Sequence, residues 1–153
     1  MIKECAPLPE FLVNLYDKWK SSSYLKNEDH YKKLASFGQN PSSMIISCCD
    51  SRVNATSIFR VDAGEFFIHR NIANLVPPYS TDDENHVTSA AIEYAIKELK
   101  IQHLIILGHS DCGGIQSGHN FHAHKSNEGY EFINKWLSIL KPAFKKISKS
   151  ISE

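Results

Sequence analysis

The strongest structural signal in the sequence lies at residues 44–52, which read Met44-Ile45-Ile46-Ser47-Cys48-Cys49-Asp50-Ser51-Arg52. The apolar residues that open this segment predict a short strand buried on both faces, as the strands of parallel sheets are. Such a strand delivers Cys48 at its carboxyl end. Because ligands gather beyond the carboxyl ends of parallel strands, Cys48 and the polar residues after it are candidates for a functional site.

A helix that leads directly into a second buried strand is predicted further along the chain. Its apolar stripe has helical spacing and consists of Val87, Ala90, Ala91, Tyr94, Ala95 and Leu99. The apolar run at residues 103–107 follows, and then a glycine. Helices that alternate with strands imply a parallel sheet with right-handed crossovers. We therefore expect an α/β fold, with a mainly parallel central β-sheet flanked by helices, in one domain over residues 1–153.

Weaker signals predict the other elements. Apolar residues at helical spacing from Leu12 to Trp19 indicate a first helix that ends in the serine cluster at 21–23. The remaining predictions are a helix over 29–37 stopped by Gly38, a buried strand over 65–68, a loop at the Pro77-Pro78 pair and a helix over 132–146.

Soft metal ligands follow both predicted central strands. Cys48 ends the first strand, and His109 and Cys112 follow the second in the run His109-Ser110-Asp111-Cys112-Gly113-Gly114. Two thiolates and one imidazole suit zinc, and a three-residue spacing lets His109 and Cys112 chelate one ion from a turn. Structural zinc sites close with four protein ligands, whereas catalytic sites keep a position for water. Asp50 is the candidate fourth ligand of a closed site.

Two neighbouring groups receive a different interpretation. Alternation along an extended segment places Cys49 in the layer opposite Cys48, where we expect a small buried hydrophobe. The histidines His119, His122 and His124 lie in a stretch with glycine and asparagine, and we expect them in a solvated surface loop.

The composition excludes several classes of protein. Seventeen basic residues balance seventeen acidic ones, so no net field attracts nucleic acid or an anionic membrane. The first nine residues carry charges and prolines instead of a secretory apolar run, and no stretch approaches the length of a membrane span. Four cysteines without Cys-x-x-Cys spacing argue against a disulfide framework. We expect a cytoplasmic protein with reduced thiols.

These motifs together resemble the β-class carbonic anhydrases. The resemblance rests on Cys48-x-Asp50-Ser51-Arg52 and His109-x-x-Cys112-Gly113-Gly114, and it extends to Gly38-Gln39-x-Pro41, Arg70-Asn71-x-Ala73-Asn74 and Ser89-x-x-Ile92-Glu93-Tyr94-Ala95. It covers the chain from about Leu12 to Phe144.

The resemblance implies reversible hydration of carbon dioxide to bicarbonate and a proton through zinc-bound hydroxide. One Zn²⁺ per chain would bind Cys48, His109 and Cys112, and Asp50 and Arg52 would form the catalytic dyad. The substrate pocket of the family falls on Gln39, Phe67, Ile72 and Tyr94. In the family this pocket forms at a subunit interface, which implies a homodimer or a higher even oligomer.

The resemblance also leaves alternatives. Asp50 ligates zinc in some family members, which would close the site, and members inhibited by bicarbonate carry a tryptophan where this chain has Ile45. We therefore expect an open site at neutral pH, with Asp50 held by Arg52. The family continues beyond the helix predicted over 132–146 with a last strand, and we expect the fold to lack that region. The alternatives are a truncated or closed-zinc pseudoenzyme with a binding role and a hydrolase of carbon disulfide or carbonyl sulfide.

Overall fold

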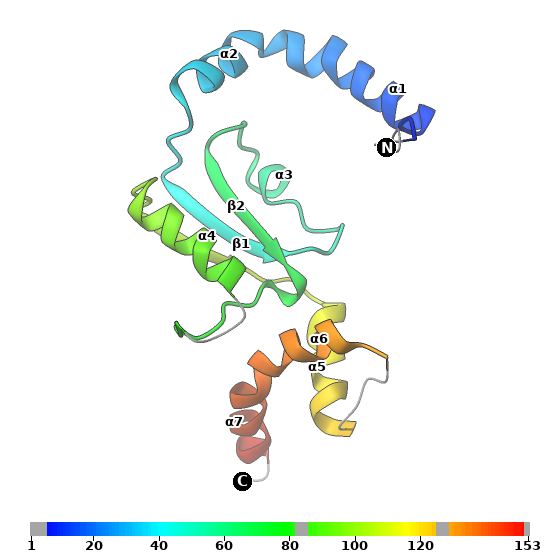
Figure 1. Cartoon of the computed structure of the whole chain (residues 1–153), viewed down its shortest axis with the longest axis vertical. Coiled ribbons are helices and arrows are strands. Elements are labelled where there is room, and N and C mark those ends of the chain that lie inside the picture. Colours follow the sequence, from blue (N-terminus) through cyan, green and yellow to red (C-terminus); the bar gives the residue numbers. More distant parts are fainter. Residues whose placement is uncertain (1–5, 82–85, 125–128, 152–153) are drawn as a thin grey trace, which may run out of the picture. The chain divides into compact units, whose positions relative to one another are not determined.

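The computed structural model describes residues 6–81, 86–124 and 129–151 (Figure 1). The chain divides into two compact units, residues 1–39 and residues 40–153. The second unit contains the sheet and all the predicted metal ligands.

The amino-terminal unit consists of two helical segments. Helix α1 spans Glu10–Trp19 and continues as a π-helical turn at Lys20–Tyr24, and α2 spans Glu28–Phe37 and ends at Gly38 with φ 78°. The prediction that the first helix stops at the serine cluster was wrong. The hydroxyl of Ser21 donates to the carbonyl of Asp17 at 2.8 Å, and that of Ser22 donates to the carbonyl of Lys18 at 2.6 Å. Both hydroxyls thus find hydrogen-bond partners within the helix, which continues through the serines.

A three-stranded parallel sheet forms the centre of the second unit. Its strands are β1 (Ser43–Cys48), β2 (Phe66–Asn71) and β3 (His103–Leu107), in the order β2-β1-β3. The β1 strand is buried along its whole length, which explains its uninterrupted apolar start. The prediction that the other two strands are also buried was wrong, because β2 and β3 lie at the edges of the sheet and their side chains are half-buried or exposed. The register pairs Met44 with Phe67 and Leu104, and Cys48 with Asn71. This confirms the predicted α/β fold, although β2 begins and ends later than the predicted 65–68.

Helix α4 covers one face of this sheet. It spans His86–Lys97 and packs Ala91, Ile92 and Ala95 against Met44 and Ile46 of β1. Those two β1 side chains share a face because alternate residues of a strand do. The short helix α3 (Ala55–Phe59) follows β1, and Figure 1 shows it on the other side of the sheet from α4. The loop at the proline pair is confirmed.

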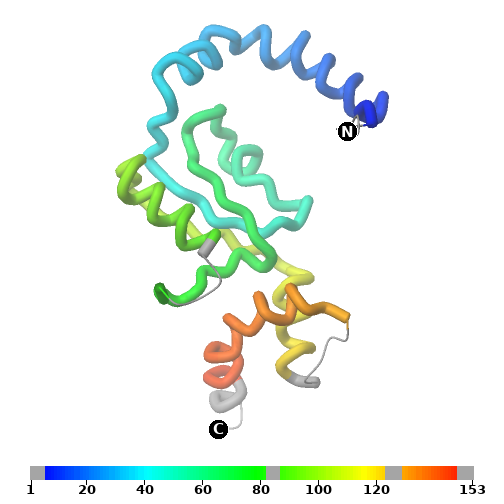
Figure 2. Tube along the Cα trace, viewed as in Figure 1, coloured from blue at the N-terminus to red at the C-terminus, as the bar shows by residue number. Residues whose placement is uncertain are grey.

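Three helices follow the sheet and pack together at the carboxyl-terminal end of the described chain (Figures 1 and 2). They are α5 (Gly113–His124), α6 (Glu131–Leu137) and α7 (Lys141–Ile151), and a 3-10 turn at Ser138–Leu140 joins the last two. A single helix over 132–146 was therefore a wrong prediction. Pro142 lacks a backbone donor and fits only the first turn of a helix, so a new helix begins at Lys141.

None of the helices in the described ranges combines the length and the apolar composition that crossing a membrane requires.

Candidate metal centre

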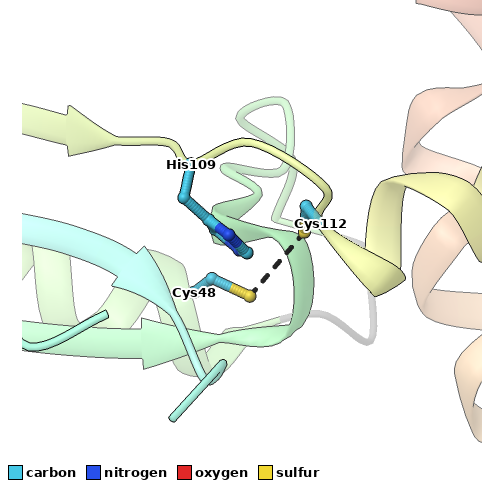
Figure 3. A group of neighbouring side chains, drawn as sticks. All are labelled: Cys48, His109 and Cys112. Atoms are coloured by element: carbon cyan, nitrogen blue, oxygen red, sulfur yellow. Dashed lines mark hydrogen bonds between the residues drawn. The ribbon is translucent and has the colours of Figure 1, made fainter. Parts of the chain in front are cut away.

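Three predicted ligands meet at the carboxyl edge of the sheet. Cys48 is the last residue of β1, His109 lies two residues after β3, and Cys112 immediately precedes α5. Their ligand atoms all lie within 4.8 Å of one another, and both thiols are buried (Figure 3). The segment after β3 thus meets the end of β1, as Figure 3 shows, and brings Cys112 to Cys48, which lies 64 positions earlier in the sequence.

The geometry of this cluster fits zinc. The two sulfur atoms are 3.8 Å apart. Two sulfurs bound tetrahedrally to one zinc ion at about 2.3 Å each would be separated by about 3.8 Å. The side chain of His109 is only 13% exposed, and its Nε2 atom has no hydrogen-bond partner among the described residues. A buried ring nitrogen beside two thiols is therefore a donor atom directed at the place where an ion would sit.

The surroundings of Cys48 favour its thiolate form. Burial opposes ionisation, but the hydrogen bond from the backbone N–H of Asp50 at 3.5 Å is the largest of several interactions that outweigh it and lower the pKa of Cys48 to about 7. His109 and the backbone N–H of Ala73 act in the same direction. A thiolate is the form that binds metal, so the sulfur is prepared to act as a ligand.

Asp50 and Arg52 form a bidentate ion pair beside the cluster. Arg52 donates from Nε to Oδ1 of Asp50 at 2.9 Å and from Nη2 to Oδ2 at 2.8 Å, and its backbone N–H also donates to Oδ1. The guanidinium holds the pKa of the Asp50 carboxyl well below its usual range. Oδ2 lies 4.0 Å from Nε2 of His109, so the ionised carboxylate borders the three ligands.

A second arginine fixes the backbone of the site. Arg70 donates from Nε to the carbonyl of Cys48 at 3.0 Å and from Nη2 to the carbonyl of Asp50 at 2.8 Å. Arg52 in turn donates to the carbonyl of Asp111 at 3.1 Å and so links the two ligand-bearing segments. The sequence showed Arg70 only as part of a motif, because a side chain that binds backbone carbonyls leaves no spacing pattern.

The predicted substrate residues are not all brought to the cluster. Ile72 directly follows β2 and lies near Cys48. The register pairs Phe67 with Met44, which precedes Cys48 by four residues on β1. At a rise of about 3.3 Å per residue this separates Phe67 from Cys48 by about 13 Å along the strand. The ring of Phe67 contacts that of Tyr94, with 5.8 Å between centroids. Gln39 belongs to the amino-terminal unit, and its role stays a prediction.

Two predictions near the site were wrong. Cys49 is exposed, because β1 ends at Cys48 and Cys49 lies beyond its buried span. His119 and His122 lie on α5 and not in a loop; both rings contact the ring of Phe144, which anchors the helix on α7. His124 is the last residue of α5.

Comparison with known proteins agrees with this geometry. The carbonic anhydrase family model matches residues 43–153. Beta carbonic anhydrase 3 of Arabidopsis thaliana is 37% identical over 135 residues, which are 88% of this chain and 52% of that protein. Beta carbonic anhydrase 5 of the same plant, a chloroplastic protein, is 35% identical over 134 residues, 88% of this chain and 42% of its own. The chain thus spans about half the length of these curated relatives.

Solved structures give the same result. The β-carbonic anhydrase CcaA aligns with a TM-score of 0.84 and 27% identity over 94% of this chain and 62% of its own. The tetrameric β-carbonic anhydrases of Sordaria macrospora align with a TM-score of 0.75 and 32% identity over 93% of this chain and 66% of theirs. With two thiols and an imidazole assembled at the sheet edge, these matches show that the chain belongs to the β-class carbonic anhydrase family.

Proposed function

We propose that this chain catalyses the reversible hydration of carbon dioxide to bicarbonate and a proton, with one zinc ion per chain held by Cys48, His109 and Cys112. The observation that carries this proposal is the three-ligand cluster with a charged Asp–Arg pair directly beside it. Three protein ligands leave a tetrahedral ion one position for water, which is the arrangement of catalytic zinc. Bound zinc supplies Lewis acidity that makes a water molecule nucleophilic near neutral pH.

Asp50 is suited to orient that nucleophile. Both of its oxygens accept hydrogen bonds from Arg52, which fixes the plane of the carboxylate and keeps it ionised. Oδ2 lies 4.0 Å from Nε2 of His109. Asp50 can therefore accept a hydrogen bond from a water molecule in the cluster and direct its lone pair at the substrate. Because Arg52 holds Asp50, we favour the open arrangement over a closed one.

A second copy of the chain would complete the substrate pocket. Ile72 is close to the ligands of its own chain, whereas Phe67 is about 13 Å away along β2 at the ordinary rise per residue. We propose a homodimer, or a higher even oligomer, in which Gln39, Phe67 and Tyr94 of the partner subunit face Ile72. The apolar rings suit a nonpolar gas, and the amide can polarise one of its oxygens. The tetrameric relatives of Sordaria macrospora support an even assembly.

A stopped-flow assay of carbon dioxide hydration tests this function. We expect zinc-loaded protein to accelerate hydration and protein stripped by a chelator to lose that acceleration, with recovery on adding zinc. Stoichiometric zinc without measurable hydration would contradict the proposal and favour the pseudoenzyme.

A further inference from the structure

The turn that follows β2 has an unusual backbone. Ala73 and Asn74 adopt φ angles of 65° and 46°, in the left-handed region that residues with a Cβ atom rarely occupy. Two such residues in succession persist only when their surroundings hold them there. Ala73 is also completely buried.

Three contacts hold this turn. The Asn71 side chain accepts a hydrogen bond from the backbone N–H of Leu75 at 2.8 Å and donates one to the Leu75 carbonyl at 2.9 Å, so it brackets the turn. The indole Nε1 of Trp136, on α6, donates to the carbonyl of Ile72 at 2.8 Å. On the third side lies Gly114 of α5, where a Cβ atom would come within 2.8 Å of Ile72 Cγ2 and 2.9 Å of Ala73 Cβ.

The same turn touches the metal ligands. Ala73 packs in one buried cluster with Cys48 and Cys112. Groups around a ligand fix its orientation and tune its affinity for the metal. The position of Ala73 therefore affects the metal centre, although neither Ala73 nor Trp136 is a ligand.

We propose that Trp136 is a positioning residue of the metal centre, which holds the left-handed turn against α5 through the Ile72 carbonyl and so keeps Ala73 packed against Cys48 and Cys112. The inference rests on the proposed function only in that the cluster binds zinc. Ile72, a predicted pocket residue, is fixed by the same hydrogen bond, so both the metal and the substrate side of the site depend on the indole N–H.

Trp136→Phe tests this proposal because it removes the N–H and keeps an aromatic ring. We expect zinc to bind about tenfold more weakly in competition with a chelator, at the lower end of the range for loss of a group that supports a metal ligand. In the cobalt-substituted protein, the sulfur-to-cobalt charge-transfer band should shift. The matched control is Phe132→Ala on the same helix. Phe132 is 88% exposed and, like Trp136, lines a cavity of about 450 Å³. We expect the Phe132→Ala variant to bind metal as the wild type does.

A pair of neighbouring glycines gives a second measurement. Gly114→Ala pushes the turn from the opposite side, whereas a Cβ atom at Gly113 meets nothing within 4 Å. We expect weakened zinc binding and a shifted cobalt band in Gly114→Ala and neither in Gly113→Ala.

The outcomes are distinguishable from those of the hydration assay. Metal affinity and the cobalt spectrum test the role of Trp136 whether or not the wild type catalyses hydration. A wild type that binds zinc without hydration would overturn only the proposed function. Wild-type affinity and an unchanged spectrum in Trp136→Phe would overturn the positioning role. Circular dichroism showing that Trp136→Phe and Gly114→Ala are both unfolded with zinc present would also overturn it, in favour of a purely structural role.

Discussion

Replacing Cys48 by serine is expected to abolish stoichiometric zinc binding, and hydration with it. Cys48 supplies one of two sulfurs placed 3.8 Å apart, and its surroundings lower its pKa to about 7. A serine hydroxyl does not ionise there and is a poor ligand for zinc. Loss of a hydrogen-bonding partner of a ligand already costs 10–100-fold in affinity, so loss of the ligand itself should cost more than about a hundredfold. Zinc content after dialysis and chelator competition measure this effect.

The neighbouring cysteine provides the control. Cys49 has the same chemistry and lies next in the sequence, but it is exposed and stands outside the three-ligand cluster. Cys49→Ser should therefore keep one zinc per chain and its hydration rate. If Cys48→Ser retained zinc as tightly as the wild type, the metal would bind elsewhere and the proposed site would be wrong.

Much of the metal centre could be predicted because two simple rules coincide in it. Short apolar runs identify the strands of a parallel sheet, and such strands end at a common edge. Cys48 and His109 each follow a run of this kind, so their meeting was predictable from one sequence. The three-residue spacing from His109 then predicted Cys112 as the third ligand.

The supporting residues could not be predicted in the same way. Trp136 acts through a single hydrogen bond to the carbonyl of Ile72, 64 residues away, and Arg70 binds only backbone carbonyls. Such contacts depend on tertiary packing and leave no periodic trace in the sequence. The helical position of the α5 histidines was not predicted for a related reason. The polar composition of this segment predicts a loop, and the contacts of His119 and His122 with Phe144 are tertiary contacts that the sequence does not reveal.

Replacing Asp50 by asparagine is expected to lower kcat/KM for hydration by about 100- to 10,000-fold, the usual contribution of a positioned acid or base. The amide has nearly the shape of the carboxylate, but it lacks the charge that Arg52 binds in two hydrogen bonds. The amide also has only one acceptor oxygen, since its nitrogen donates, so it cannot accept hydrogen bonds from both Arg52 and the nucleophilic water as the carboxylate can, and that water loses its fixed orientation. Stopped-flow hydration on zinc-loaded protein gives the measurement. Arg52→Lys should have a smaller effect in the same direction, because a lysine keeps the charge but not the bidentate geometry.

Zinc affinity in the same Asp50→Asn variant separates the open site from the closed one. In the open arrangement Asp50 binds Arg52 and not the metal, as the bidentate pair indicates. Replacing Asp50 should therefore leave zinc affinity close to that of the wild type. If Asp50 were the fourth ligand, the variant would lose affinity, and the wild type would show little hydration to lose. The control is Glu28→Gln, which removes the carboxylate of the exposed Glu28–Lys32 pair on α2 and should change neither quantity. A fall in zinc affinity confined to Asp50→Asn would therefore contradict the open site and favour a structural zinc.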